Sequence, residues 1–230
     1  MAAFDFKKEY KDIYLPKQKP ALIQVMPMKY FMVIGSGDPN TSETYQNALA
    51  VLYGLSYGIK MSKKSGTQPQ GYFDYVVPPL EGLWWGEDGY YDGVNITDKE
   101  RFHWIAMIRQ PDFVTEAAYR TAREALQKKK PELDLSTTAF VTLDEGLCAQ
   151  IMHVGPYDTE PESIGALDDF VKVQGYVTDI QEPTGVMDAA DLEHMLGSCR
   201  LHHEIYLGDP RKTKPENLKT VIRHPVREEA

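Results

Sequence analysis

The sequence predicts an α+β fold in which a strand-helix-strand-strand unit occurs twice, with mostly antiparallel sheets and the helices on one side. Two stretches with helical spacing of apolar residues, 41–64 and 160–172, support this prediction. Each follows a stretch rich in branched and aromatic residues, and further extended stretches come after each helix. With helices on one face, the other face of the sheet would be available for a cleft.

The first half begins with a strand region at 22–36, which Pro27 divides because a proline is not expected inside a central strand. The helix at 41–64 follows, with a threonine and a serine available to cap its first turn. A second long helix is predicted at 113–130 and links the two halves. Between the two helices lie extended stretches at 72–77, 80–86 and 102–109, with a turn-rich acidic loop at 87–98.

The second half begins with a hairpin around Asp144-Glu145-Gly146. The helix at 160–172 follows, and then a strand at 201–207 that stops at Gly208-Asp209-Pro210. Shorter elements lie between them, an extended piece at 176–180 and a helix at 189–196.

We expect residues 1–20 to form an N-terminal arm and residues 21–230 to form a single domain. Its two pseudo-repeats span about 21–130 and 131–210, and a C-terminal tail follows. The tail is predicted to contain a short helix at 215–223, because a proline and then a glutamate suit the first turn of a helix.

Charge and composition exclude several classes of function. The formal net charge of −9 argues against a nucleic-acid partner, because phosphate contacts need basic patches. Cys148 and Cys199 have no CxxC spacing, so a disulfide scaffold or a zinc ribbon is not supported. No apolar run approaches the roughly 18 residues of a membrane span, and no P-loop or dinucleotide fingerprint is present. We therefore expect a cytoplasmic protein without a cofactor, a bound metal or a membrane anchor.

The strand at 201–207 carries a candidate catalytic group. Side chains alternate between the faces of a strand, so His202, Glu204 and Tyr206 share one face. We expect this face to line the cleft, and the face with Ile205 and Leu207 to contact the helices. A carboxylate in the middle of a strand is costly to bury without a partner, so Glu204 needs water, an ion pair or a functional cavity.

Three interpretations of Glu204 stay open from the residues alone. It could be a pocket carboxylate whose altered pKa suits it to act as a general acid or base. It could bind a metal with His194, Cys199 and His202, although no HExxH or CxxC spacing supports that site. It could also form a structural ion pair with an arginine or lysine, such as Arg109 or Arg200.

Tryptophans on two extended stretches indicate an aromatic cage. Trp84 and Trp85 occupy adjacent positions and must face opposite sides of their strand, so at most one of them belongs naturally to a core. Trp104 lies on the next strand, and the chain has 14 tyrosines. Tyrosine and tryptophan combine a large apolar surface with a polar tip, as ligand pockets require.

Several motifs together resemble the GyrI-like small-molecule-binding superfamily, in its stand-alone single-domain branch, from about residue 20 onward. The most specific motif is His202-His203-Glu204-Ile205-Tyr206-Leu207-Gly208-Asp209-Pro210-Arg211-Lys212. The others are Leu80-Glu81-Gly82-Leu83-Trp84-Trp85, Ile108-Arg109-Gln110-Pro111-Asp112-Phe113-Val114-Thr115 and His153-Val154-Gly155-Pro156-Tyr157-Asp158.

The resemblance implies a duplicated fold with a central ligand cleft between its halves, and a glutamate at the pocket floor that matches Glu204. One stand-alone subgroup, the cyclopropanoid cyclopropyl hydrolases, hydrolyses cyclopropane-bearing DNA-alkylating natural products with an aromatic cage. The chain is similar to that subgroup in its tryptophan segment and its His-His-Glu strand. The chain lacks a basic helix-turn-helix extension, so the resemblance does not suggest a transcription factor.

We therefore predict a protein that binds bulky, planar, drug-like aromatic molecules and hydrolyses them, with Glu204 as the catalytic residue acting on a water. The expected ligand-binding residues are Trp84, Trp85, Trp104, Tyr206, His153, Tyr157 and His202. The alternative is a module that binds or sequesters the same ligands without chemistry, and the sequence alone does not separate the two.

Overall fold

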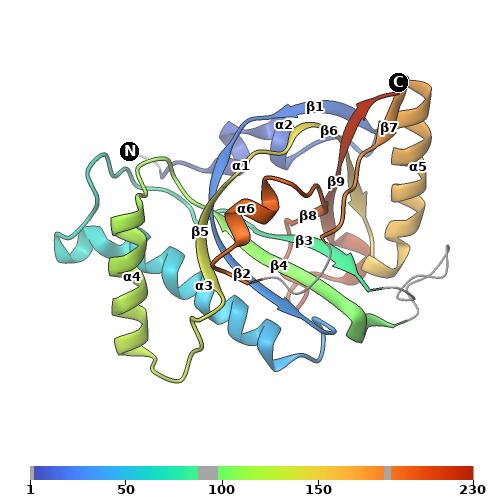
Figure 1. Ribbon diagram of the computed structural model, residues 1–230. Coiled ribbons are helices and arrows are strands. Elements are labelled where there is room, and N and C mark those ends of the chain that lie inside the picture. The colour runs from blue at the N-terminus through green and yellow to red at the C-terminus, as the bar shows by residue number, and fades with distance from the viewer. Residues whose placement is uncertain (1–2, 88–97, 184–187, 230) are drawn as a thin grey trace.

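The computed structural model describes residues 3–87, 98–183 and 188–229 (Figure 1). Nine strands in these ranges form one antiparallel sheet with the order β1-β6-β9-β8-β3-β4-β2-β5, and β7 pairs with β9. The sheet curls around the short helix α6 (Figure 1). The strands are β1 Ala21–Val25, β2 Met28–Ser36, β3 Leu80–Gly86, β4 Phe102–Arg109, β5 Thr138–Leu143, β6 Gly146–Val154, β7 Tyr176–Thr178, β8 His202–Tyr206 and β9 Lys219–Glu228.

The duplicated unit predicted from the sequence is confirmed. The first copy is β2-α3-β3-β4 and the second is β6-α5-β8-β9, and the copies meet where β3 pairs with β8. Gly82 and Glu204 are partners in that pairing, so Glu204 lies on the midline between the two halves. Each half also lends a strand to the other, since β1 pairs with β6 and β5 pairs with β2.

Three long helices cover one face of the sheet, which we call the outer face. They are α3 Glu43–Met61, α4 Glu116–Lys129 and α5 Glu160–Val173. Helix α3 packs its Leu52 and Leu55 against Val33 of β2 and Trp104 of β4. Helix α5 packs Leu167 and its neighbours against the apolar side chains of β6 and β9. The predicted helices on one side are therefore present.

Shorter helices occupy the opposite, inner face. Helices α1 Phe6–Glu9 and α2 Lys11–Tyr14 bury Phe6 and Tyr14 against Ile205 of β8, and α6 Leu192–Leu196 packs on Leu83 of β3. Four 3-10 turns complete the described elements, at Ser62–Ser65, Lys99–Arg101, Tyr157–Thr159 and Pro215–Asn217.

Two sequence predictions about elements are wrong or shifted, and a third falls mostly on residues that the structure does not describe. Residues 72–77 do not form a strand, because prolines on both sides limit pairing to one bridge between Tyr75 and Phe4. The linking helix begins at Glu116, where the Thr115 side chain caps it, and not at 113. Most of the predicted acidic loop at 87–98 lies outside the described residues.

The C-terminal tail forms a central strand instead of the predicted short helix. The proline and glutamate at 215–216 start only a 3-10 turn. The residues that follow form β9, which is buried along most of its length and lies between β6 and β8. Burial on both faces between two neighbouring strands outweighs the weak local preference for a helix. The tail is thus the last strand of the second half.

Within the described residues, the helices are all too short or too polar to cross a membrane.

Candidate functional site

The Glu204 carboxylate is held by two neighbours on its own strand. His202 Nε2 lies 2.9 Å from Glu204 Oε1, and the Tyr206 hydroxyl donates to Oε2 at 2.6 Å. The Glu204 side chain keeps 14% of its surface exposed. Each carboxylate oxygen has two lone pairs, so both oxygens can still accept a hydrogen bond from a water or a ligand.

These hydrogen bonds decide the charge of Glu204. Burial alone would raise its pKa, but the hydrogen bond and charge of His202 and the hydrogen bond from Tyr206 bring the pKa below its usual value. Burial, together with the charge of Glu204, raises the pKa of Tyr206, which therefore stays protonated as a donor. The site thus presents an ionised carboxylate at neutral pH.

A tryptophan from the other half of the fold lies over this group. Trp84 Nε1 donates to the Tyr206 hydroxyl at 2.8 Å. The indole folds back over Gly82, the residue paired with Glu204, and a Cβ at Gly82 would stand 2.6 Å from Trp84 Nε1. Only glycine permits this approach, which places a half-buried aromatic ring beside the carboxylate.

Further aromatic side chains flank the Trp84–Tyr206 pair. Tyr45 of α3 lies 6.1 Å from Trp84 between ring centroids, and Phe102 lies 5.7 Å from it on another side. Tyr157, just before α5, packs edge-on against Tyr206 at 5.9 Å. The rings come from both halves of the chain, and they surround the midline of the sheet between α3 and α5.

A second buried carboxyl group lies next to Glu204. Glu160, in the first turn of α5, is only 7% exposed, and its Oε1 has no hydrogen-bond partner among the described residues. Burial and the negative charge of Glu204 raise the pKa of Glu160 far above its usual value. One proton is therefore held by the pair, on Glu160, while Glu204 is ionised. The sequence did not reveal Glu160, because an acidic residue in a first turn ordinarily only complements the helix dipole.

Comparison with known proteins places the chain among three solved structures from Listeria innocua. A crystal structure of an uncharacterized conserved protein is 43% identical, with a TM-score of 0.83, over 97% of this chain and 100% of that one. Two structures described as hydrolases are 42% identical, with TM-scores of 0.80 and 0.83, and cover 97% and 98% of this chain and all of theirs.

The chain belongs to the family of these Listeria proteins. No protein-family model matches the chain, and neither does any curated protein. A cryo-EM structure of an EcmrR–DNA complex is 12% identical, with a TM-score of 0.50, over 97% of this chain and 63% of that one. This likeness concerns the fold alone, whereas the Listeria family members match in sequence as well.

Two of the three tryptophans are buried in the core. Trp85 points to the inner face and is 5% exposed, stacked on His103 at 5.5 Å, which corrects its expected place in the cage. Adjacent strand positions face opposite sides, so Trp84 alone of this pair reaches Glu204. Trp104 shares the outer face but is 1% exposed, under Tyr45 and close against Gly35. It supports the ring cluster from below.

His153 holds the connection between β6 and α5. Its Nδ1 lies 2.9 Å from Ser163 Oγ, and its Nε2 lies 3.1 Å from the Pro156 carbonyl oxygen. A cavity of about 350 Å³ lies beside it and is lined also by Thr159, Glu162 and Glu216. His153 thereby fixes the turn that carries Tyr157.

The prediction for the Glu204 strand is right about which residues share a face and wrong about where that face points. His202, Glu204 and Tyr206 do share one face, but that is the outer face, on which the three long helices lie. Ile205 lies on the inner face, in a cluster with Phe6 of α1, Tyr14 of α2 and Tyr75. Helices α3 and α5 flank the midline, so Glu204 lies between them and not opposite them.

The other two interpretations of Glu204, an ion pair with Arg109 or Arg200 and a metal site, are not supported. The Arg109 guanidinium packs over the rings of Phe6 and Tyr10, at 4.9 and 4.4 Å. Arg200 forms an ion pair with Asp179 at 2.7 Å. In the part of the chain that the structure describes, no three His, Cys, Asp or Glu residues are grouped as metal ligands.

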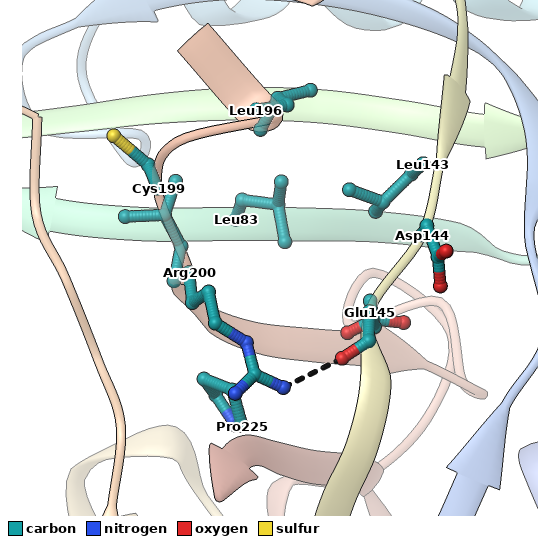
Figure 2. Close-up of a pocket in the computed structure, with 9 residues that line it drawn as sticks. Leu83, Leu143, Asp144, Glu145, Leu196, Cys199, Arg200 and Pro225 are labelled. Carbon is teal, nitrogen blue, oxygen red and sulfur yellow. Dashed lines mark hydrogen bonds between the residues drawn. The ribbon is translucent and has the colours of Figure 1, made fainter. Parts of the chain in front are cut away.

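Figure 2 shows a cavity on the inner face, away from Glu204. Arg200 crosses it and donates to the Glu145 carbonyl oxygen at 2.7 Å. The cavity volume is about 20 Å³, enough for one water molecule and too small for an organic ligand. Its apolar wall consists of Leu83, Leu143, Leu196, Leu201 and Pro225.

Proposed function

We propose that the protein binds planar aromatic molecules on the outer face between α3 and α5, and hydrolyses a strained, electrophilic ring in them. The observation that carries this proposal is an ionised Glu204, with free lone pairs, beside the half-buried rings of Trp84 and Tyr206 and the exposed ring of Tyr157. Two family members at 42% identity are described as hydrolases, which supports the reaction class.

The resemblance to the GyrI-like superfamily supports the substrate class. Its motifs include the strand with Glu204 and the segment with Trp84, which lie side by side in the sheet. The proposed substrates are accordingly cyclopropane-bearing, DNA-alkylating xenobiotics, whose hydrolysis would protect the cell.

In the proposed reaction, Glu204 acts as a general base on one water molecule. Rings stacked on the planar ligand hold the electrophilic carbon near that water, which replaces a bimolecular encounter by a fixed geometry. The water oxygen bonds to the carbon as a ring C–C bond breaks. The electron pair of that bond moves into the conjugated ligand, which then takes a proton from solvent, and Glu204 holds the proton lost by the water.

The test is to incubate the protein with a cyclopropane-containing alkylator in ¹⁸O-labelled water and to follow the product by mass spectrometry. We expect many equivalents of a product that carries one ¹⁸O. Glu204→Gln should lower turnover by about 10²–10⁴-fold and leave ligand binding nearly unchanged. Glu116→Gln is the matched control, because Glu116 is paired with Arg120 on the exposed side of α4.

The second candidate function is binding without chemistry. It is favoured by the fact that both Glu204 oxygens already accept a hydrogen bond, an arrangement that also suits a fixed charge for a cationic ligand. Consumption that stops at one equivalent would leave only this function. Equal turnover by Glu204→Gln would instead remove Glu204 from the mechanism.

A further inference from the structure

We propose that the ligand cleft continues from Glu204 along α3 to a second aromatic subsite at Tyr53, which selects substrates built of two linked planar ring systems. The inference rests on the proposed function, because it extends the same ligand site. It makes Tyr53 a specificity-determining residue, with Tyr57 beside it and the turn at Asp209 and Arg211 at the end of the subsite.

Two sides of α3 are covered by other elements. One side packs on the sheet through Leu52 and Leu55. Another lies against α4, where a Cβ at Gly54 would stand 2.8 Å from the Leu126 side chain. Helix α5 packs over β6 and β9, away from the strands that α3 and α4 cover. The flank of α3 opposite α4 therefore borders the space between α3 and α5.

That flank carries a ridge of side chains spaced four residues apart, Tyr45, Leu49, Tyr53 and Tyr57. Residues four apart lie above one another on a helix, so they form one continuous surface. Exposure along this α3 ridge rises from 8% at Tyr45 to 39% at Tyr53 and 50% at Tyr57. The rings of Tyr53 and Tyr57 are 6.4 Å apart between centroids. The α3 ridge thus joins the rings around Trp84 to an open aromatic surface.

The turn after β8 lies at the level of the second half of α3. Leu80 pairs with both Ile108 and Tyr206, so the ends of β4 and β8 are level in the sheet. Gln110, two residues after Ile108, donates to Ser56 Oγ of α3 at 3.1 Å. This hydrogen bond sets the second half of α3 over the edge of the sheet where the chain leaves β8.

Asp209 marks the end of the subsite. Its carboxylate accepts from the backbone N–H and the guanidinium of Arg211, each at 3.0 Å, which holds the turn in one shape. Burial raises the pKa of both Tyr53 and Tyr157, and the charge of Asp209 adds to the shift of each. Asp209 therefore lies near tyrosines from both walls of the cleft, Tyr53 on α3 and Tyr157 before α5.

The length of the α3 ridge defines the kind of ligand. Eight residues separate Tyr45 from Tyr53, which is about 12 Å along a helix axis. One planar ring system seated at Glu204 does not span this length, whereas two linked ring systems do. Tyrosine offers a flat apolar face and a polar edge to the second one. Asp209 and Arg211 neutralise each other, so the subsite suits an uncharged second unit.

The test uses two inert ligands in which a gem-dimethyl group replaces the cyclopropane of the alkylator. One contains the first planar unit alone, and the other has a second planar ring system linked to it. Calorimetry should show that the wild-type protein binds the two-unit ligand about tenfold more tightly. Tyr53→Ala should remove this advantage without changing the Kd of the one-unit ligand, and Tyr53→Phe should keep most of it. Equal weakening of both ligands, or an unchanged advantage in Tyr53→Ala, would overturn the subsite.

Tyr10→Ala is the matched control. Tyr10 is 38% exposed, as Tyr53 nearly is, but it stacks on Phe6 toward the inner face, so neither Kd should change. The same two compounds with an intact cyclopropane test the hydrolysis separately. Hydrolysis of both with equal kcat/KM would overturn the subsite and leave the proposed reaction standing. Binding that depends on Tyr53 without any turnover would establish the subsite and remove the reaction.

Discussion

The two faces of β8 carry adjacent histidines in opposite situations. His202, on the outer face, binds Glu204 in a half-open setting, and the side chains of both residues keep about a sixth of their surface exposed, 17% and 14%. His203, on the inner face, binds Glu81 at 3.0 Å and Glu145 at 2.8 Å, and its side chain is fully buried. One strand therefore carries two histidine–glutamate clusters that differ in access to solvent.

The inner cluster is enclosed and is held together by protein donors. Glu81 accepts hydrogen bonds from Tyr14, Tyr30 and His203. Glu145 accepts from His203 and from Arg223 at 2.8 Å, and Arg223 also donates to Gln150. Although burial opposes it, His203 and Arg223 lower the pKa of Glu145 to about 2.

The difference teaches that a buried charge does not by itself mark an active site. The inner carboxylates are more deeply buried, are held by protein donors, and fix the relative positions of β3, β8, β9 and the β5–β6 hairpin. The outer carboxylate has free lone pairs, a neighbouring acid and a partly open surface. Four changes would test this division, beginning with the one that should have the largest effect.

Arg223→Met should lower the free energy of unfolding by about 3–5 kcal/mol, because it leaves Glu145 charged and buried without its partner. Urea unfolding measures this loss. Arg227→Met is the control on the same strand, where an exposed guanidinium pairs with Asp179 and should contribute at most about 1 kcal/mol. Equal losses in the two variants would contradict the structural role of the inner cluster.

Acid should weaken the inner cluster in a defined pH range. The folded-state pKa of Glu145 lies below its unfolded value, so its contribution is complete above about pH 4.5 and is lost as the pH falls toward 2. The shift corresponds to about 3 kcal/mol. Unfolding measured between pH 6 and 2.5 should show the stability gap between wild type and Glu145→Gln shrinking as the pH falls. A constant gap would refute this assignment.

Two glycines under tryptophans should respond differently to alanine. A Cβ at Gly35 would stand 2.2 Å from the fully buried Trp104 ring, so Gly35→Ala should cost about 1–3 kcal/mol of stability. A Cβ at Gly82 would displace the half-buried Trp84, which can swing outward. Gly82→Ala should therefore change stability less and weaken ligand binding, as calorimetry with the alkylator would measure. The reverse ranking of stabilities would show that Trp84 is a core residue.

The smallest expected effect separates the adjacent tryptophans. Trp84→Phe removes the hydrogen bond to Tyr206 and part of the ring surface, and should weaken ligand binding by about 1 kcal/mol. Trp85→Phe, on the inner face, should leave the ligand Kd unchanged in the same titration. Equal weakening by both would mean that the ligand does not lie on the outer face.

The sequence predicted what depends on local geometry. Strand alternation correctly grouped His202, Glu204 and Tyr206, and it required Trp84 and Trp85 to separate. It could not find Glu160, because this residue reaches Glu204 only through the packing of α5 on the sheet. Two local signals also misled, since a helix-like start at 215–216 preceded a strand and an aromatic run at 72–77 packed as a loop.

The exchange of β1 and β5 between the halves has a consequence for how the chain can be divided. Ala21 pairs with Gln150, and Met28 pairs with Leu143, so each half completes its sheet edge with a strand from the other. Cutting the chain between α4 and β5 should not release two autonomous domains. It should give two fragments that fold only by complementation, and the Glu204 site, at their shared midline, would report their reassembly.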